Sequence, residues 1–186
     1  MARLNVGDKM PNLTVNTAYE ENKSIADIVN GKRTVFWVLR YIGCTTCRYD
    51  VHLFIKRYQE FKDKDTQVVI VMQSRPERIQ EDVREEMNGE KLPFDIICDT
   101  DFQFYNTLEI KPAASKEELI GPDTEKMEKR RNAVKEAGFE HGEYEGDELQ
   151  LPAMFITNGD LTVTNARYCK HITDMPTIDE LLEMLS

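Results

Sequence analysis

One stretch of the chain decides the fold: Arg33-Thr34-Val35-Phe36-Trp37-Val38-Leu39-Arg40-Tyr41-Ile42-Gly43-Cys44-Thr45-Thr46-Cys47. The β-branched and aromatic residues that open it are typical of a buried strand. Beyond it, apolar side chains recur every three or four residues, as on one face of a helix, at Val51, Phe54, Ile55, Tyr58 and Phe61. The sequence therefore predicts a core strand followed by a helix that begins at the two cysteines, with Thr45 or Thr46 as its N-cap.

Cys44 and Cys47 form a Cys-x-x-Cys pair at this junction. The first turn of a helix has unpaired N–H groups and a partial positive charge, which together stabilise an anion. A thiolate is such an anion, and thiols of Cys-x-x-Cys pairs at a helix start commonly have a lowered pKa. We interpret the pair as a redox active site. Cys44, nearer the helix start and the solvent, is expected to attack as the thiolate, and Cys47 to resolve the mixed disulfide.

Length, composition and charge limit the classes of protein. A chain of 186 residues suits one domain, residues 1–186, with a substantial core. No apolar run approaches the roughly 18 residues that a membrane-spanning helix needs, so we expect no membrane partner. The net charge of −10 argues against nucleic acid, because phosphate binding requires a basic patch.

Cysteine usage and the first residues bear on the compartment. The segment Met1-Ala2-Arg3-Leu4-Asn5-Val6-Gly7-Asp8 contains no apolar core of a signal peptide. Four cysteines in an unexported chain of this length do not indicate a structural disulfide framework. We therefore expect a cytoplasmic location.

Strand and helix patterns alternate along the chain. Apolar runs predict strands, and amphipathic spacing with end signals predicts helices. The expected strands cover about 34–39, 67–72, 94–98, 153–157 and 161–164, the last two flanking the hairpin signal Asn158-Gly159-Asp160. The expected helices cover about 24–31, 45–62, 76–89, 101–108 and the stretch after Pro176. This order predicts an α/β fold in which helices sandwich a mixed central sheet.

The segment from Lys111 to Gln150 differs from the rest. It is strongly charged, contains two prolines and shows helical character over Thr124–Ala137. A bare loop of this length is unusual in a compact domain. We interpret residues 111–150 as an insertion that covers the site or one edge of the sheet.

Three parts of the chain resemble a known family: Gly7-Asp8 with Pro11, the run Leu39–Arg48 around the cysteines, and Gly146-Asp147-Glu148-Leu149-Gln150-Leu151-Pro152. The chain resembles the redoxin superfamily, and within it the peroxiredoxin-like proteins of the alkyl hydroperoxide reductase/thiol-specific antioxidant (AhpC/TSA) group. The resemblance implies a thioredoxin-like fold and an antioxidant-type oxidoreductase. It also implies a cis proline at Pro152, beside the cysteines, after the charged insertion and at the start of the next strand.

The chain departs from the family at the reactive thiol. Peroxiredoxins carry Pro-x-x-x-Thr-x-x-Cys around the thiol that attacks peroxide. If Cys47 is that thiol, Arg40 and Cys44 occupy the Pro and Thr positions of the motif. If Cys44 is that thiol, Trp37 and Tyr41 occupy those positions. Because neither alignment restores the motif, we expect a thiol–disulfide oxidoreductase. Hydroperoxide reduction is the first alternative, and a non-catalytic zinc- or partner-binding module on the same fold is the second.

Four residues are expected to support the cysteine pair: Arg40 through its charge, Thr45 and Thr46 through their place between the cysteines, and Pro152 through the resemblance. A second close-spaced ligand pair, the usual sign of zinc, is missing from the sequence, so we expect no metal. The dithiol requires no cofactor but an external donor, a thiol or a thioredoxin-type reductant. The substrate is a disulfide or a hydroperoxide, and a homodimer is left open.

Overall fold

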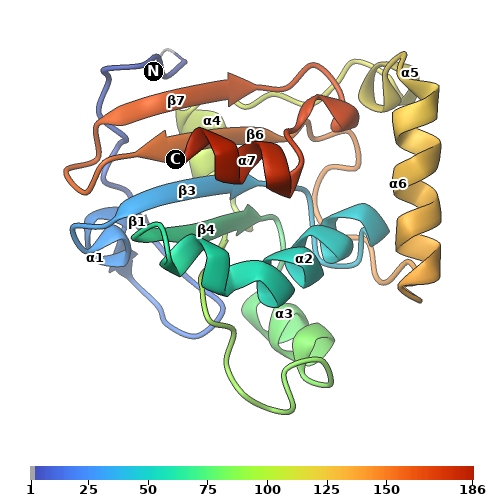
Figure 1. Ribbon diagram of the computed structural model, residues 1–186, viewed down its shortest axis with the longest axis horizontal. Helices are drawn as coiled ribbons and strands as arrows, with labels where there is room; N and C mark the ends of the chain where they lie inside the picture. Colours follow the sequence, from blue (N-terminus) through green and yellow to red (C-terminus); the bar gives the residue numbers. More distant parts are fainter. Residues whose placement is uncertain (1–2) are drawn as a thin grey trace.

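The computed structural model describes residues 3–186; Met1 and Ala2, where the expected entry segment begins, lie outside them. A five-stranded mixed sheet forms the centre of the fold, in the strand order β5-β4-β3-β6-β7 (Figure 1). The strands are β3 Arg33–Val38, β4 Thr66–Met72, β5 Asp95–Cys98, β6 Ala153–Thr157 and β7 Val163–Tyr168. The predicted α/β class with a mixed central sheet is confirmed.

The strand β3 lies in the middle of the sheet. It pairs parallel with β4 and antiparallel with β6, and every residue from Thr34 to Val38 is buried. Burial on both faces is the reason why this run is apolar throughout instead of alternating. The strand that leads to the cysteine pair is therefore enclosed on both faces.

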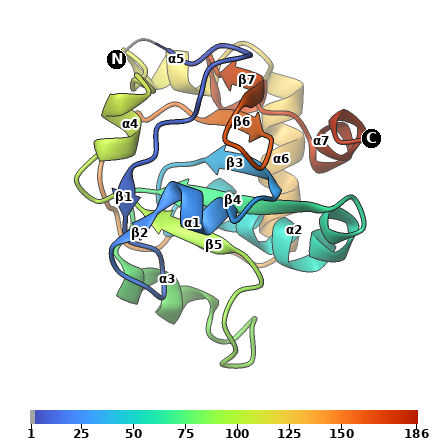
Figure 2. The same ribbon diagram turned by 90° about the vertical axis from the view of Figure 1, so that its left-hand side faces the viewer.

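Helices cover both faces of the sheet (Figure 2). On one face lie α2 Thr45–Lys62, α3 Pro76–Val83 and α7 Ile178–Met184, whose apolar side chains share a core with Trp37. On the other face lie α1 Ile25–Val29 and α4 Gln103–Thr107, where Phe104 stacks on Phe36 at 6.3 Å between ring centroids. Phe36 and Trp37 are neighbours on β3 and point to opposite faces, because side chains alternate along a strand. The remaining short elements are β1 Thr14–Val15, β2 Lys23–Ser24 and the 3₁₀ turn η1 Ile172–Asp174.

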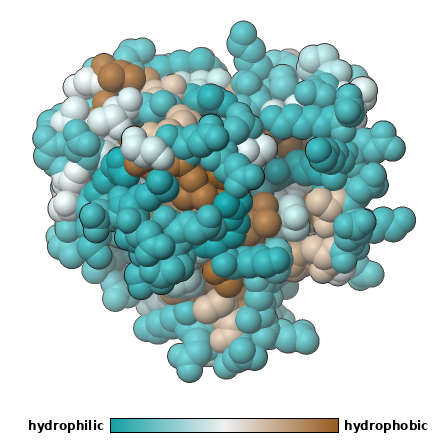
Figure 3. Space-filling model, in the orientation of Figure 1, coloured by the Kyte–Doolittle hydropathy of each residue, from teal (hydrophilic) through white to brown (hydrophobic). Residues whose placement is uncertain are grey.

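Hydrophilic residues cover most of the face shown in Figure 3, and apolar side chains are visible mainly near its centre. This agrees with a composition in which 31% of the residues are charged. Among the helices of residues 3–186, none is both long enough and apolar enough to cross a bilayer.

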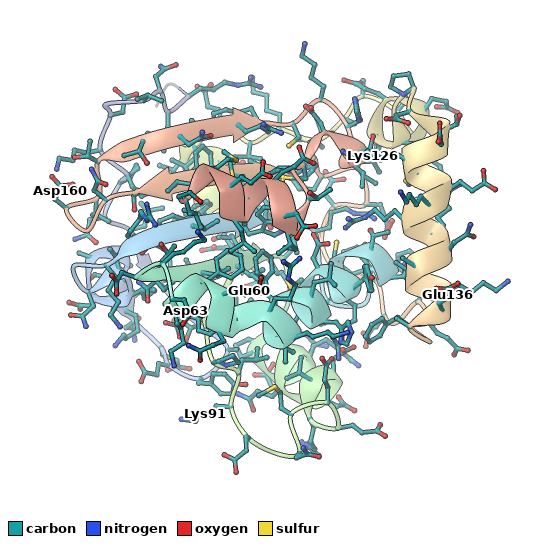
Figure 4. All side chains as sticks on the ribbon, in the orientation of Figure 1. Glu60, Asp63, Lys91, Lys126, Glu136 and Asp160 are labelled. Carbon is teal, nitrogen blue, oxygen red and sulfur yellow. The ribbon has the colours of Figure 1, made fainter. Side chains whose placement is uncertain are left out.

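The charged segment 111–150 contains two helices. One is α6 Thr124–Glu136 with Ala137 as its C-cap, as predicted. The other, α5 Lys116–Ile120, was not predicted, because five residues are too few to show an apolar period. α6 packs against α2 beside its first turns (Figure 1), and Figure 4 labels Lys126 near its start and Glu136 at its end. The segment therefore covers the end of α2 that carries the cysteines.

Two predicted boundaries are wrong. The helix that begins at Pro76 ends at Val83 instead of continuing to about Gly89, because the chain then forms turns in which Gly89 has a positive φ. The second strand of the hairpin is expected from Leu161, but it begins at Val163. Leu161 has a φ of +71° and so belongs to the turn.

The prediction of a cis bond at Pro152, which the resemblance implied, is also wrong. The Leu151–Pro152 bond is trans, as are all peptide bonds in residues 3–186. The segment before β6 is held extended, since Gln150 bridges to Pro112 and the Pro152 carbonyl accepts the Cys169 N–H at 3.2 Å. A trans bond, which proline favours by about 0.5–1 kcal/mol, continues this extended course into β6.

Candidate active site

The N-cap of α2 is Cys44 itself, not the predicted Thr45 or Thr46. Its backbone is extended, and its Sγ accepts the N–H of Cys47 at 3.4 Å. Thr46 Oγ1 lies 3.3 Å from the same sulfur. The sulfur thus takes the place that a Ser or Asp oxygen takes at other helix starts, where the N–H groups and the helix dipole stabilise negative charge.

The guanidinium of Arg40 lies against this sulfur. Its Nη2 donates a hydrogen bond to Cys44 Sγ at 2.9 Å. Its Nη1 donates to the Glu148 carbonyl at 2.8 Å and lies 3.3 Å from the Glu148 carboxylate. The Arg40 side chain is only 14% exposed, so solvent screens its charge weakly. The structure places Arg40 where the sequence analysis expected a charge that supports the thiolate.

The two thiols of the pair differ in acidity. A hydrogen bond from the Cys47 side chain lowers the pKa of Cys44; the charge of Arg40 and the hydrogen bond with Thr46 act in the same direction, against burial. Burial, followed by the hydrogen bond to Cys44 and its charge, raises the pKa of Cys47. The pair therefore holds one proton at neutral pH, on Cys47, and carries the thiolate on Cys44. These are the protonation states that the predicted roles require.

The expectation that Cys44 lies nearer the solvent is wrong. Cys44 is 2% exposed and Cys47 is 4% exposed. Residues 139–148, which we call the strap, cross above the sulfur: the Gly142 N–H donates to the Gly43 carbonyl at 2.8 Å. The approach is so close that a Cβ on Gly43 would lie 3.0 Å from the Glu143 nitrogen. A substrate therefore reaches Cys44 only beside the strap or after it moves.

Polar contacts hold the strap in place. The buried Tyr41 hydroxyl donates to the Glu148 carboxylate and lies 3.1 Å from His141 Nε2. Two contacts join the strap to the region of α3: Arg78 pairs with Glu143, and the Arg75 N–H donates to Glu145 at 3.0 Å. Sequence reasoning assigned no role to Tyr41 or His141, because residues 100 positions apart show no common spacing. Exposed ion pairs such as Arg78–Glu143 contribute about 0–1 kcal/mol each, so the hydrogen bond from the buried Tyr41 to Glu148 and the Gly142–Gly43 backbone bond are the stronger anchors of the strap.

A buried carboxylate lies one turn beyond Cys47. Asp50 is 3% exposed, and its Oδ2 accepts the Trp37 indole N–H at 2.9 Å. Its Oδ1 accepts a hydrogen bond from Arg130 Nη2 at 2.7 Å, and the same nitrogen donates to the Thr46 carbonyl at 3.1 Å. These contacts join α6 to the first turn of α2. Sequence reasoning missed Asp50 and Arg130, although the position of Asp50 on the apolar stripe after Cys47 was a usable signal.

A small cavity lies behind Cys47. Its volume is about 20 Å³, and its lining includes Cys47, Asp50, Arg130 and Pro152. Because one water needs about 10–15 Å³ of such space, the cavity has room for a single water molecule. Pro152 therefore lies beside the cysteine pair as the resemblance implied, although its peptide bond is trans.

The other two cysteines lie apart from this chemistry. All four cysteines are free thiols. Burial raises the pKa of Cys98 and that of Cys169 to about 12, so both are protonated and unreactive at neutral pH. Across residues 3–186, no group of three or more His, Cys, Asp or Glu side chains is placed to hold a metal ion.

Comparison with known proteins shows the family and the fold of the chain. The sequence model described as the AhpC/TSA family matches residues 6–166. No curated protein matches the sequence. A mutant of peroxiredoxin 6 from Arenicola marina has a TM-score of 0.70 at 13% identity, over 98% of this chain and 72% of its own. The yeast mitochondrial 1-Cys peroxiredoxin has a TM-score of 0.69 at 13% identity, over 98% and 75%. A peroxiredoxin-like protein from Aquifex aeolicus has a TM-score of 0.64 at 16% identity, over 98% and 86%.

Proposed function

The chain belongs to the AhpC/TSA family of thiol-dependent oxidoreductases, and from that premise we propose that it reduces disulfides with Cys44 and Cys47 as its redox pair. One observation carries the proposal: the two thiols share a helix turn and differ in protonation, with the thiolate on the N-cap and the proton on its partner. A dithiol in this state can begin an exchange reaction without a separate base.

The reaction follows in two steps. The Cys44 thiolate attacks one sulfur of the substrate disulfide; a Cys44–substrate bond forms, the substrate S–S bond breaks, and the departing thiolate takes a proton from solvent. Cys47 then loses its proton and attacks the Cys44 sulfur, which releases the second substrate thiol. The substrate has gained two electrons, and the protein is left with a Cys44–Cys47 disulfide.

The cycle requires an external donor of two electrons. We propose a thiol or a thioredoxin-type reductant, which attacks the Cys44–Cys47 disulfide and restores the dithiol. The yeast 1-Cys relative is described as acting through glutathione/thioredoxin systems, which supports this class of donor. Arg40 supports both directions of the exchange, because its Nη2 stabilises negative charge on Cys44 whenever that sulfur is the leaving group.

Hydroperoxide reduction is the second candidate, and family membership favours it. In this reaction the Cys44 thiolate attacks the terminal peroxide oxygen, the O–O bond breaks, and an alcohol leaves with a proton. Cys47 then attacks the resulting sulfenic acid, water leaves, and the same disulfide forms. We rank this reaction second because the residues around the pair do not follow the peroxiredoxin motif.

Steady-state assays separate the two reactions. With dithiothreitol as donor, we expect turnover of hydroxyethyl disulfide that Cys44→Ser abolishes and that Cys98→Ser, the matched control, leaves intact. Faster consumption of hydrogen peroxide than of the disulfide would reverse the ranking. If neither substrate is reduced and the purified protein carries stoichiometric zinc, the binding-module alternative replaces both.

A further inference from the structure

A cleft opens beside the cysteine pair, between the start of α2 and the end of α6. Its volume is about 310 Å³, the size of a small-molecule site. Its lining includes Thr45 and Thr46 from α2, Arg131 and Lys135 from α6, and Phe139 and Glu140 from the strap. Figure 1 shows α6 standing alongside the first turns of α2 at this place.

The cleft concentrates positive charge that the protein itself does not neutralise. Arg131 and Lys135 lie one turn apart on α6, and neither forms an ion pair or a side-chain hydrogen bond within residues 3–186. The neighbouring Arg130, by contrast, is bound to Asp50. The chain as a whole has a net charge of −10, but this cleft carries two cations that are unpaired within residues 3–186. Glu140 is the one acidic residue among those that line it. The N-terminus of α2 is already capped by the Cys44 sulfur, so Arg131 and Lys135 supply the positive charge of the cleft.

Thr46 connects the cleft to the reactive sulfur. It lines the cleft, and its Oγ1 lies 3.3 Å from Cys44 Sγ. A ligand in the cleft is therefore separated from the thiolate by a single threonine side chain. Cys44 itself does not line the cleft and is 2% exposed, so a molecule held there reaches the sulfur only when Thr46 or the strap shifts.

We infer that the cleft recruits small disulfides that carry carboxylates. The carboxylate pairs with Arg131 and Lys135, and the apolar part of the molecule lies against Val134 and Phe139. Arg131 and Lys135 are positioning residues, because they hold the substrate and do not touch the exchanging sulfurs. This inference rests on the proposed function, since it names the substrate class of the same site.

Alkylation of Cys44 tests the cleft without any redox turnover. Iodoacetate is anionic, whereas iodoacetamide is neutral and has the same leaving group. The measured quantity is the rate of Cys44 alkylation by iodoacetate divided by its rate with iodoacetamide. We expect this ratio to fall about threefold to tenfold in the Arg131→Gln/Lys135→Gln variant, and to rise in Glu140→Gln. Lys129→Gln, which removes a cation of α6 outside the cleft, should leave the ratio unchanged. Salt near 1 M should abolish the difference, because it screens exposed charges.

Turnover provides the second readout. For the same double variant, KM for 3,3′-dithiodipropionate should rise relative to KM for the neutral hydroxyethyl disulfide, with kcat for the anionic substrate unchanged. An alkylation ratio that stays the same in the double variant, or that falls equally in Lys129→Gln, overturns the inference. A changed ratio together with absent disulfide reduction would leave the anion site standing and refute the proposed function instead.

Discussion

Arg40 Nη2 and Cys44 Sγ lie 2.9 Å apart, and the sulfur is at the same time the N-cap of α2. One atom thus accepts hydrogen bonds from a guanidinium and from the first turn of a helix. Both donors favour the ionised sulfur. Arg40 and Cys44 are four positions apart on the connection from β3 to α2, so this short segment brings the guanidinium and the sulfur together.

Removal of the Arg40 charge should raise the pKa of Cys44. A positive charge beside a thiol favours the thiolate, so its loss favours the protonated form. We expect Arg40→Met to move the midpoint of the pH profile for iodoacetamide alkylation up by about one unit or more, and Arg40→Lys to move it less. An unchanged midpoint in Arg40→Met would show that the acidity is set without Arg40, by the hydrogen bond from Cys47 and the other groups around the sulfur.

The lowered pKa of Cys44 also makes folding stability depend on pH. In the unfolded chain the thiol has a pKa near 8.5, so the folded state binds fewer protons at Cys44 between its lowered pKa and that value. The resulting stabilisation is present above the unfolded pKa and is lost as pH falls through the folded pKa. The difference in unfolding free energy between the reduced wild type and Cys44→Ser should therefore grow as pH rises from 4 to 8 in urea titrations. A difference that is constant over this range contradicts the ionised N-cap.

The Asp50–Arg130 pair is expected to stabilise the fold at the site. Truncation of Asp50 leaves the buried Trp37 indole N–H without an acceptor and leaves Arg130, whose side chain is 26% exposed, without its carboxylate, at a cost of about 1–3 kcal/mol. We expect Asp50→Ala to lower the free energy of unfolding by that amount in urea titrations followed by the fluorescence of Trp37, the single tryptophan. The Asp50→Leu/Arg130→Met variant, which removes both charges, should recover much of the loss. A cost below about 1 kcal/mol for Asp50→Ala would mean that the pair is solvated.

Gly43→Ala should displace the strap. The added Cβ would overlap the Glu143 carbonyl oxygen and lie 3.0 Å from the Glu143 nitrogen, and backbone atoms cannot rotate away as a side chain can. Since the strap covers Cys44, we expect alkylation of Cys44 to become faster in this variant. Glu143→Ala is the matched control, because it removes the ion pair with Arg78 and keeps the backbone contact; its effect should be smaller. Equal rates in Gly43→Ala and wild type would show that the strap does not limit access.

The strand–helix junction was predictable, because local patterns encode it. The apolar run of β3 and the helical period after Cys47 each lie within about 18 consecutive residues, and both elements form where expected. The N-cap was assigned to the threonines because a hydroxyl is the usual cap. The Cys44 thiolate, with Arg40 beside it, caps the helix in place of a hydroxyl. Its ionisation depends on contacts between side chains that cannot be read from the sequence.

The environment of the pair was not predictable from local patterns. The burial of Cys44 depends on the close approach of Gly142 to Gly43, and Asp50 is bound by a residue 80 positions away. Such contacts follow from packing α6 and the strap against α2, which no periodicity specifies. The cis bond before Pro152 is expected from the resemblance alone, and the bridge that holds Gln150 extended joins it to Pro112, 38 positions earlier in the chain.

Cysteine mapping after treatment with one equivalent of hydroxyethyl disulfide tests the central claim most directly. In the wild type we predict a single disulfide between Cys44 and Cys47, with Cys98 and Cys169 still free. In Cys47→Ser we predict a stable mixed disulfide on Cys44, since no resolving thiol remains. An adduct on Cys47 in the Cys44→Ser variant that forms as fast as the wild-type disulfide, or Cys44 and Cys47 both unmodified in the wild type, would contradict the account.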